Sequence, residues 1–320
     1  MLDGGKNYTM IVFKEEDVVS LPYLRYLAQK QCVQIDQPWL ADLLHLPQSC
    51  SVSLKKPPIL YDSSAADLIA LPFLHINSSY LYDVTRVKLR TVHNHSEDTI
   101  ETIIEIVNDQ RILFSFQRVI PLGSLNPRRD PQLFINDELS SSNLCGLGAL
   151  NTGSPIVFCL ESYQPGRSED HAAINIAEGL HWLENVTTLI LHNSAVEPCL
   201  VALEPNSREE LAWHSTVHSL VIYSYSQFDS TGADILQSLL RVSKGRKIAG
   251  IPFRSVTLAI PSTTLVVSSG ELAALDEYIE GFEFLAGDDA LDWDVDKYFV
   301  PDYDPLQVRR DKSAFDVDLS

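Results

Sequence analysis

Short runs of β-type residues recur along the chain, and they are the clearest pattern of apolar and polar positions in it. We predict strands at residues 85–92, 111–120, 155–163, 186–193, 217–225 and 254–260. The central residues of these strands lie 27, 42, 31, 31 and 38 positions apart. A spacing of about 30 residues falls within the range of repeat proteins. The pattern therefore indicates a repeated, strand-containing unit.

Most intervals between these strands contain one amphipathic pattern, with apolar residues three or four positions apart as on one face of a helix. The pattern predicts helices at residues 169–183, 231–242 and 268–279. Gly245 is placed to cap the carboxyl end of the second helix, and Ser268 or Ser269 to cap the amino end of the third. The chain thus alternates strand and helix.

The first unit spans residues 18–54, with the sequence "VVSLPYLRYLAQKQCVQIDQPWLADLLHLPQSCSVSL". We predict a strand with Leu21, Leu24 and Leu27 as core contacts, a short helix at residues 38–45, and then a second strand. A terminal repeat needs a cap over its open edge.

Strands that alternate with helices around one sheet imply parallel strands and crossover connections. Two architectures meet this condition. In a doubly wound sheet the strands are buried on both faces and read as unbroken apolar runs, whereas in a solenoid one face stays open and alternate residues are polar. "VTTLILHN" and "RVKLRTV" alternate, although "PIVFCL" does not. The sequence therefore favours an α/β solenoid over the doubly wound sheet.

Alternation also predicts which side chains leave the core. On strand 85–92, Val87 and Leu89 face inward, so Arg86, Lys88 and Arg90 form a basic row on the other face. Such a row suits an acidic ligand or the acidic tail of the chain itself, and a solvated face is the simpler alternative.

The same reasoning applies to strand 186–193, where Leu189 and Leu191 face inward and Ile190 and His192 face outward.

A pair of tyrosines is the third candidate on the outward face. On strand 217–225, Leu220 and Ile222 form the apolar, core-facing set. Tyr223 and Tyr225 then lie exposed on the other side, as in the hot spots of protein interfaces. The alternative is that both tyrosines pack under the adjacent repeat.

Composition limits the class of partner. The formal net charge is −19, from 43 acidic and 24 basic residues, which fits neither nucleic acid nor an anionic membrane surface. No apolar run approaches the roughly 20 residues of a membrane span, and we see no signal peptide. Five scattered cysteines indicate reduced, mostly buried thiols. We therefore expect a cytoplasmic or nuclear protein.

The chain divides into three parts. Residues 1–17 form a lead-in, residues 18–300 form a single α/β domain, and residues 301–320 form an acidic tail that we expect to be disordered. The segment 287–320 holds ten aspartates against four basic residues.

One acidic motif resembles the start of a calcium-binding loop. Asp292, Asp294 and Asp296 have the right spacing, but Lys297 and Tyr303 stand where such a loop needs glycine and a bidentate glutamate. We therefore expect no calcium site there.

The remaining candidates for chemistry lack partners in the sequence. His93 with His95, and His214 with His218, have no third metal ligand, and Cys145 has no neighbouring base. We expect no catalytic, cofactor-binding or metal-ligating residues, and thus a protein that is not an enzyme.

Several segments resemble one known family. "VSLPYLRYL" with "WLADLLHLPQSCSVSL", and then "LENVTTLIL", "CLVALEPN", "VHSLVIYSY", "KGRKIAGIPFRSVTLAI", "LDEYIEGFEFLAGDD" and "LDWD", are similar to the leucine-rich-repeat portion of F-box-type proteins of mushroom-forming fungi. The resemblance covers residues 18–293 and is strongest over 185–293. It implies a leucine-rich-repeat-like solenoid with parallel strands on the concave face and helices on the convex face.

The resemblance also bears on function. Such proteins carry an F-box, a helical segment beginning "LPxELLxxI" that docks a cullin-ligase adaptor, and we find none in this sequence. Only the partner-binding half of the family's function is therefore implied: recognition of a protein, as in the substrate receptor of a ubiquitin ligase, with adaptor binding dependent on an F-box encoded upstream. The second hypothesis is a doubly wound α/β enzyme with its site at the carboxyl ends of the strands.

Overall fold

The structure is a computed structural model, and it describes residues 19–20, 23–30, 44–45, 47, 50–56, 83–94, 99–108, 111–121, 155–161, 185–193, 196–205, 216–223, 231–260 and 268–291. Its longer strands are β2 (Tyr26–Lys30), β4 (Ser51–Lys56), β5 (Arg86–Asn94), β6 (Thr99–Val107), β7 (Ile112–Pro121), β8 (Ile156–Glu161), β9 (Val186–His192), β10 (Ser219–Tyr223), β11 (Ser255–Ile260) and β12 (Phe282–Ala286). A separate pair joins β1 (Val19–Ser20) to β3 (Leu44–His45).

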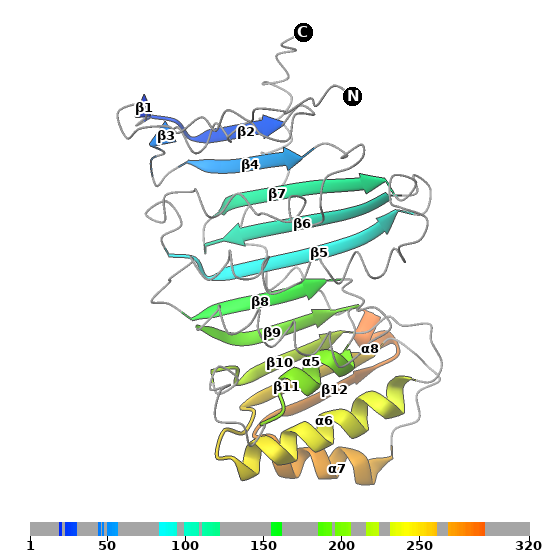
Figure 1. The fold of residues 1–320 in the computed structure, drawn as a ribbon. Helices are drawn as coiled ribbons and strands as arrows, with labels where there is room; N and C mark the ends of the chain where they lie inside the picture. Colours follow the sequence, from blue (N-terminus) through cyan, green and yellow to red (C-terminus); the bar gives the residue numbers. More distant parts are fainter. Residues whose placement is uncertain are drawn as a thin grey trace, which may run out of the picture.

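In the described part of the chain, the ten longer strands form one open sheet in the order β12-β11-β10-β9-β8-β5-β6-β7-β4-β2 (Figure 1). From β8 to β12 the spatial order follows the chain, and all of these pairs are parallel. Between β4 and β8 it does not, because β4 pairs with β7 while β5 pairs with β8. The antiparallel strand β6 lies between β5 and β7. The protein is thus an α/β protein with a mostly parallel sheet.

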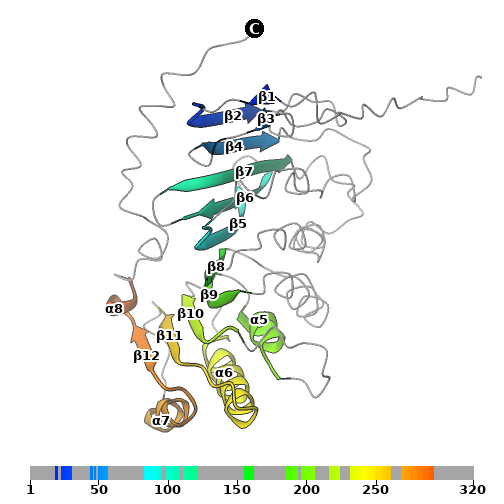
Figure 2. The same cartoon turned by 90° about the vertical axis from the view of Figure 1, so that its left-hand side faces the viewer.

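The longer helices that the structure describes cover one face of this sheet. They are α5 (Val196–Ala202), α6 (Thr231–Ile248) and α7 (Ser269–Tyr278). Leu200, Leu239 and Leu275 from these helices are buried in the same core as the strands. Figure 2 shows the sheet curving away from them, so that they lie on its outer side. The short helix α8 (Asp288–Leu291) contributes Ala290 to a second cluster on the opposite face.

Apolar rows run across the sheet and form its core. One row has a side chain from every one of the ten strands, in register: Leu27, Val52, Phe114, Ile106, Val87, Phe158, Leu189, Leu220, Val256 and Phe282. A second row lies two residues further along, through Phe116, Ile104, Leu89, Leu160, Leu191, Ile222, Leu258 and Phe284.

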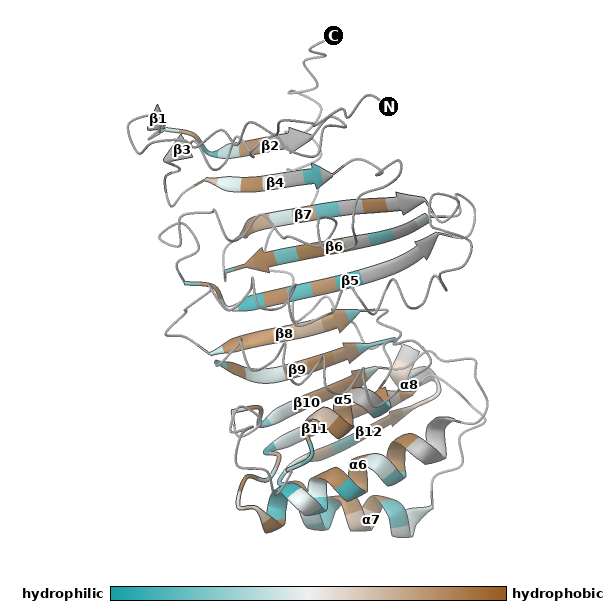
Figure 3. Ribbon diagram, in the orientation of Figure 1, coloured by the Kyte–Doolittle hydropathy of each residue, from teal (hydrophilic) through white to brown (hydrophobic). Residues whose placement is uncertain are grey.

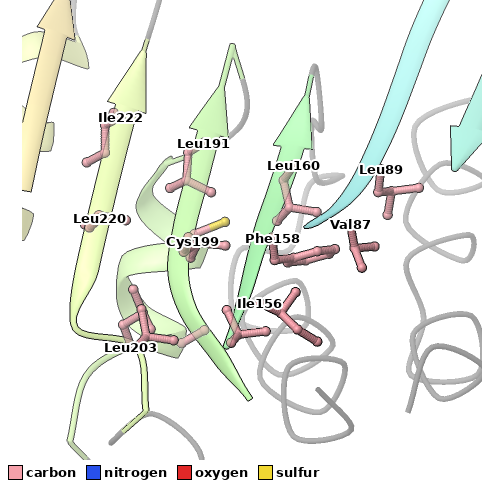
Figure 4. Close-up of a cluster of buried hydrophobic side chains, with 14 of the residues drawn as sticks. Val87, Leu89, Ile156, Phe158, Leu160, Leu191, Cys199, Leu203, Leu220 and Ile222 are labelled. Atoms are coloured by element: carbon pink, nitrogen blue, oxygen red, sulfur yellow. The ribbon is translucent and has the colours of Figure 1, made fainter. Parts of the chain in front are cut away.

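Most of these side chains are fully buried, and each such burial contributes about 1.5 to 3 kcal/mol. Figure 4 shows the part of this core under β5, β8, β9 and β10, closed by Cys199 and Leu203. The alternation of apolar and polar positions is visible along the strands in Figure 3.

A third apolar position precedes the first row by three residues in several units. It is buried, or partly buried in the case of the first, at Leu24, Val84, Val186, Val217, Phe253 and Ile279. Each of these units therefore has the form apolar-x-x-apolar around the start of its strand.

All six predicted strands are present as β5, β7, β8, β9, β10 and β11, with ends that agree with the prediction to within two residues. The structure adds β6, β12 and α5, which the sequence patterns did not predict. The helix predicted at 169–183 lies outside the described residues. In the segment predicted as a helix at 38–45, residues 44–45 form a strand, and the rest is likewise not described.

Helix α6 extends past its predicted end. Gly245 lies inside the helix, so its predicted capping role is wrong. Gly250 takes that role with φ of +78°, because Ile251 N donates to Arg246 O at 2.9 Å and Gly250 N to Lys247 O at 3.1 Å. This is the Schellman arrangement, which favours glycine because its φ is positive.

The predicted amino-terminal cap of the third helix is confirmed in α7. Ser268 Oγ accepts from Glu271 N at 3.2 Å, and the Glu271 carboxylate accepts from Ser268 N at 3.0 Å. The two residues form a capping box.

A buried arginine fastens three successive units together. Arg246 of α6 is fully buried, and its guanidinium donates to the carbonyls of Leu203 and Val217. The same group lies 4.3 Å from the centre of the Phe253 ring. Burial lowers the pKa of Arg246 to about 10, so the side chain remains charged at neutral pH. It links α6 to the chain after α5 and to the turns before β10 and β11.

Candidate functional site

The face of the sheet opposite α5, α6 and α7 is called the strand face below. Its side chains come from the strand residues that alternate with the two core rows. On β5, β8, β9, β10 and β11 they include Arg86, Lys88, Arg90, Val157, Cys159, Glu161, Thr188, Ile190, His192, Ser219, Val221, Tyr223, Ser255, Thr257 and Ala259. The predicted orientation of strands 85–92 and 186–193 is confirmed, since Val87, Leu89, Leu189 and Leu191 lie in the main core.

Glu161, at the carboxyl end of β8, is the centre of a charged cluster on this face. Lys88 Nζ lies 2.8 Å from Glu161 Oε2, and Arg90 Nε lies 3.3 Å from Oε1. His192 Nδ1 lies 3.5 Å from the same Oε1 atom. The strand register explains the cluster, because Arg90, Glu161 and His192 are direct neighbours on β5, β8 and β9.

The surroundings of Glu161 determine its charge. Its side chain is only 10% exposed, and burial alone would raise its pKa. Hydrogen bonds from His192 and Lys88 and the charges of Lys88 and Arg90 outweigh burial and lower the pKa from 4.5 to about 2. Glu161 is therefore ionised throughout the neutral range. At neutral pH Glu161 therefore pairs as an anion with Lys88 and Arg90 and has no proton to donate.

His192 connects this cluster to an apolar one. Its ring centroid lies 4.9 Å from that of Tyr223, with the planes tilted by 54°. Tyr223 packs with Cys159, Ile190, Val221, Ala259 and Ala290. Tyr223 has the predicted orientation, but the predicted exposure is wrong, because the side chain is only 9% exposed. The alternative of a packed tyrosine is what the structure shows.

Five of the six predicted site residues therefore share one face and, apart from Arg86, meet around Glu161 or His192. Tyr225 lies outside the described residues. Lys88 is 12% exposed and Arg90 is 43% exposed, so Arg90 presents more of its side chain to solvent than Lys88 does. Arg86 is half-buried.

The sequence prediction missed Glu161, which organises the cluster. It follows the apolar run "IVFCL", and the alternation that identified the other residues is hidden there. Both faces of β8 are buried: Phe158 and Leu160 lie in the main core, and Cys159 lies under Tyr223 and its neighbours. The available signal was that Glu161 lies two residues after Cys159 on the same strand, so both side chains must point to the strand face.

Of the other residues considered in the sequence, His218 contacts a neighbouring side chain, and several lie outside the described residues. His218 Nδ1 lies 3.1 Å from Ser219 Oγ, and burial with the charges of Arg254 and Arg246 lowers its pKa. His95, His214, Cys145 and the aspartates after residue 291 lie outside the described residues. Within the described ranges, no three histidine, cysteine, aspartate or glutamate side chains are grouped to hold a metal ion.

Comparison of the chain with protein-family models, with curated proteins and with solved structures found no match. Among the described helices, none combines the length and the apolar character that crossing a membrane requires.

Proposed function

We propose that the protein is a non-catalytic protein–protein interaction module, a leucine-rich-repeat-like solenoid that binds a protein partner on its strand face in the cytoplasm or nucleus. The observation that carries the proposal is the contrast between the two faces of one curved sheet. In the described chain, α5, α6 and α7 cover the outer face and the four-residue helix α8 lies on the other, whereas a doubly wound sheet has long helices on both.

The apolar rows support the repeat architecture. The repeating pattern of leucine-rich repeats begins with apolar residues at positions one, four and six. Val186, Leu189 and Leu191 have this spacing. So do the corresponding residues of the next units: Val217, Leu220 and Ile222, then Phe253, Val256 and Leu258, then Ile279, Phe282 and Phe284. In each unit the second and third residues lie in the two core rows.

Two features differ from a simple solenoid. The ninth position of the repeat pattern is normally asparagine or cysteine, and in the four units of this chain it holds Ser194, Tyr225, Pro261 and Gly287. In addition, β5, β6 and β7 are placed in reverse order between β4 and β8. The solenoid proposal therefore rests chiefly on β8 to β12, with the reversed segment as an insertion in it.

The strand face supplies the chemistry of an interface. The sheet holds Arg90 with its side chain 43% exposed and its Nε 3.3 Å from Glu161 Oε1. Arginine is one of the residues enriched in the hot spots of protein interfaces. Lys55 on β4 and Glu283 on β12 are exposed at the two ends of the same face.

Site-specific photo-crosslinking tests the face. A benzophenone amino acid is placed at Lys55 or Glu283 on the strand face, and at Gln237 or Lys244 on the outward side of α6 as matched exposed controls. We expect a crosslinked protein of defined mass from the strand-face positions and none from the α6 positions. Crosslinks confined to α6, or equal at all four positions, would contradict the proposal.

A relation to ubiquitin ligases is the finer part of the proposal and rests on the family resemblance. The chain then represents the substrate-recognition part of an F-box-type receptor. Sequencing the transcript upstream of Met1 tests this, because an in-frame F-box would connect the module to a cullin-ligase adaptor. A transcript without one would leave partner binding as the proposed function.

A further inference from the structure

The sheet has two edge strands, and they run in the same direction. In the described chain β2 pairs only with β4, and β12 pairs only with β11. Each neighbouring pair is parallel apart from the two that involve β6, and these two reversals cancel. One edge is therefore able to continue the parallel order of the other.

The main-chain groups on the free side of β2 follow from its pairing. Ser51 N donates to Arg25 O at 2.8 Å. Along a parallel edge strand, successive residues direct their N–H and C=O groups alternately to the neighbour and to the free side. The groups of Tyr26 and Ala28 therefore point away from β4.

The same reasoning applies to β12. Val256 N donates to Gly281 O at 2.9 Å, so Gly281 and the alternate residues after it bond to β11. The N–H and C=O groups of Phe282 and Phe284 therefore point to the free side of β12. An added strand would satisfy them.

The described residues at the two ends of the sheet carry opposite charges. Among the described residues up to 56 there are four lysines or arginines and no carboxylate: Arg25, Lys30, Lys55 and Lys56. Among residues 268–291 there are seven carboxylates and no lysine or arginine: Glu271, Asp276, Glu277, Glu280, Glu283, Asp288 and Asp289. Attraction between such ends steers association and weakens with salt.

We propose that copies of this chain associate head to tail, with β2 of one copy added as a strand to β12 of another. The free main-chain groups of the two edges meet when Leu27 lies opposite Phe282. This register continues the first core row from one copy into the next. It also places Arg25 opposite Glu280, and both side chains are exposed.

The charges disfavour the alternative pairings. Two β12 edges would bring carboxylates together, and two β2 edges would bring cations together, so like charges oppose symmetric dimers. A head-to-tail contact is heterologous, and it leads to rings or open chains of molecules rather than closed pairs. The occupant of each edge is therefore the unlike edge of a second copy.

Charge reversal in the full chain tests the register. The variants R25E and E280R each place like charges at the contact, and we expect each to weaken self-association by about threefold to tenfold. An equimolar mixture of the two variants restores both attractive pairs, as does the double variant R25E/E280R. Sedimentation velocity over a range of concentrations, at about 0.05 M and about 0.5 M salt, measures the association.

Circular dichroism melts establish that these exposed substitutions leave the fold intact. Recovery of association in the mixture and in the double variant supports the proposal. The proposal is overturned if the wild-type chain stays monomeric at about 1 mM in low salt, or if R25E and E280R associate like the wild type. Neither result affects partner binding on the strand face, because a crosslink to a partner protein differs in mass from a crosslink to a second copy of the chain.

Discussion

Lys88 of β5 and Glu161 of β8 form an ion pair of 2.8 Å on the strand face, in which the carboxylate is 10% exposed and the ammonium group's side chain 12% exposed. The pair lies between two parallel strands that are adjacent in space but separated by β6 and β7 in the chain. It therefore links the segment β5 to β7, whose strands are in reverse order, to the part of the sheet from β8 to β12, whose strands follow the chain.

Replacing this carboxylate should destabilise the fold. The E161Q variant removes the negative charge beside Lys88 and Arg90, and we expect a loss of roughly 1 to 3 kcal/mol in the free energy of unfolding at pH 7. Urea denaturation of both proteins measures this difference. A variant as stable as the wild type would show that the cluster contributes nothing to folding.

Acid titration of stability follows from the same group. The folded pKa of Glu161 is about 2 and its ordinary value is 4.5, so its contribution is complete above pH 4.5. Because the folded pKa is the lower one, the contribution is lost as the pH falls from 4.5 towards about 2. We expect the wild-type advantage over E161Q to disappear across this window. An advantage that persists unchanged at pH 2 would be inconsistent with a lowered pKa.

The buried arginine offers a second test. The R246M variant keeps the volume of the side chain but leaves the carbonyls of Leu203 and Val217 without their donor. We expect a loss of about 2 to 4 kcal/mol. The matched control is R241M on the same helix, since Arg241 is 52% exposed and pairs only at the surface with Glu197 and Glu204. Its effect should stay below about 1 kcal/mol, and equal effects would contradict the role of Arg246.

The cap of α6 can also be tested by substitution. Gly250 has φ of +78° with no atom near the position of an added Cβ, so G250A meets backbone strain without steric overlap. We expect a loss of about 1 kcal/mol. The control G270A lies in α7 near only Ser268 Oγ at 4.0 Å, and it should be neutral or slightly stabilising. Thermal melts compare the two, and a stabilising G250A would exclude the Schellman cap.

The buried cysteines should resist alkylation. Burial raises the pKa of Cys50 to about 11 and that of Cys199 to about 12, so neither forms appreciable thiolate at pH 8. We expect iodoacetamide to modify both in urea and neither in the native protein, as peptide mass spectrometry would report. Rapid native labelling of Cys199 would contradict the burial of this α5 side chain in the main core.

The orientation of side chains on the strands was predictable from the sequence, because alternation on a strand separates the two faces directly. The basic row of β5 and the inward leucines of β9 were found in this way. Exposure was not predictable for Tyr223. A side chain that points away from the main core is still buried when other residues pack against it, as Tyr223 is in the cluster that includes Ala290 of α8.

The order of strands in the sheet was not predictable either. β6 has the alternation of a strand, with Ile104 and Ile106 inward and Glu105 between them, but a repeat of one strand and one helix has no place for it. Nothing local in the sequence specifies that β4 pairs with β7 rather than with β5. That choice depends on contacts between segments far apart in the chain.

The reversed placement of β5, β6 and β7 also determines how the sheet assembles. Each strand from β9 to β12 joins the strand that precedes it in the chain, so this half grows by successive additions. β4 pairs with β7, which comes three strands later in the chain, and β7 in turn pairs with β6. We therefore expect β2 and β4 to dock last during folding and to detach first during unfolding, so that their amide hydrogens exchange with solvent before those of β9 and β10.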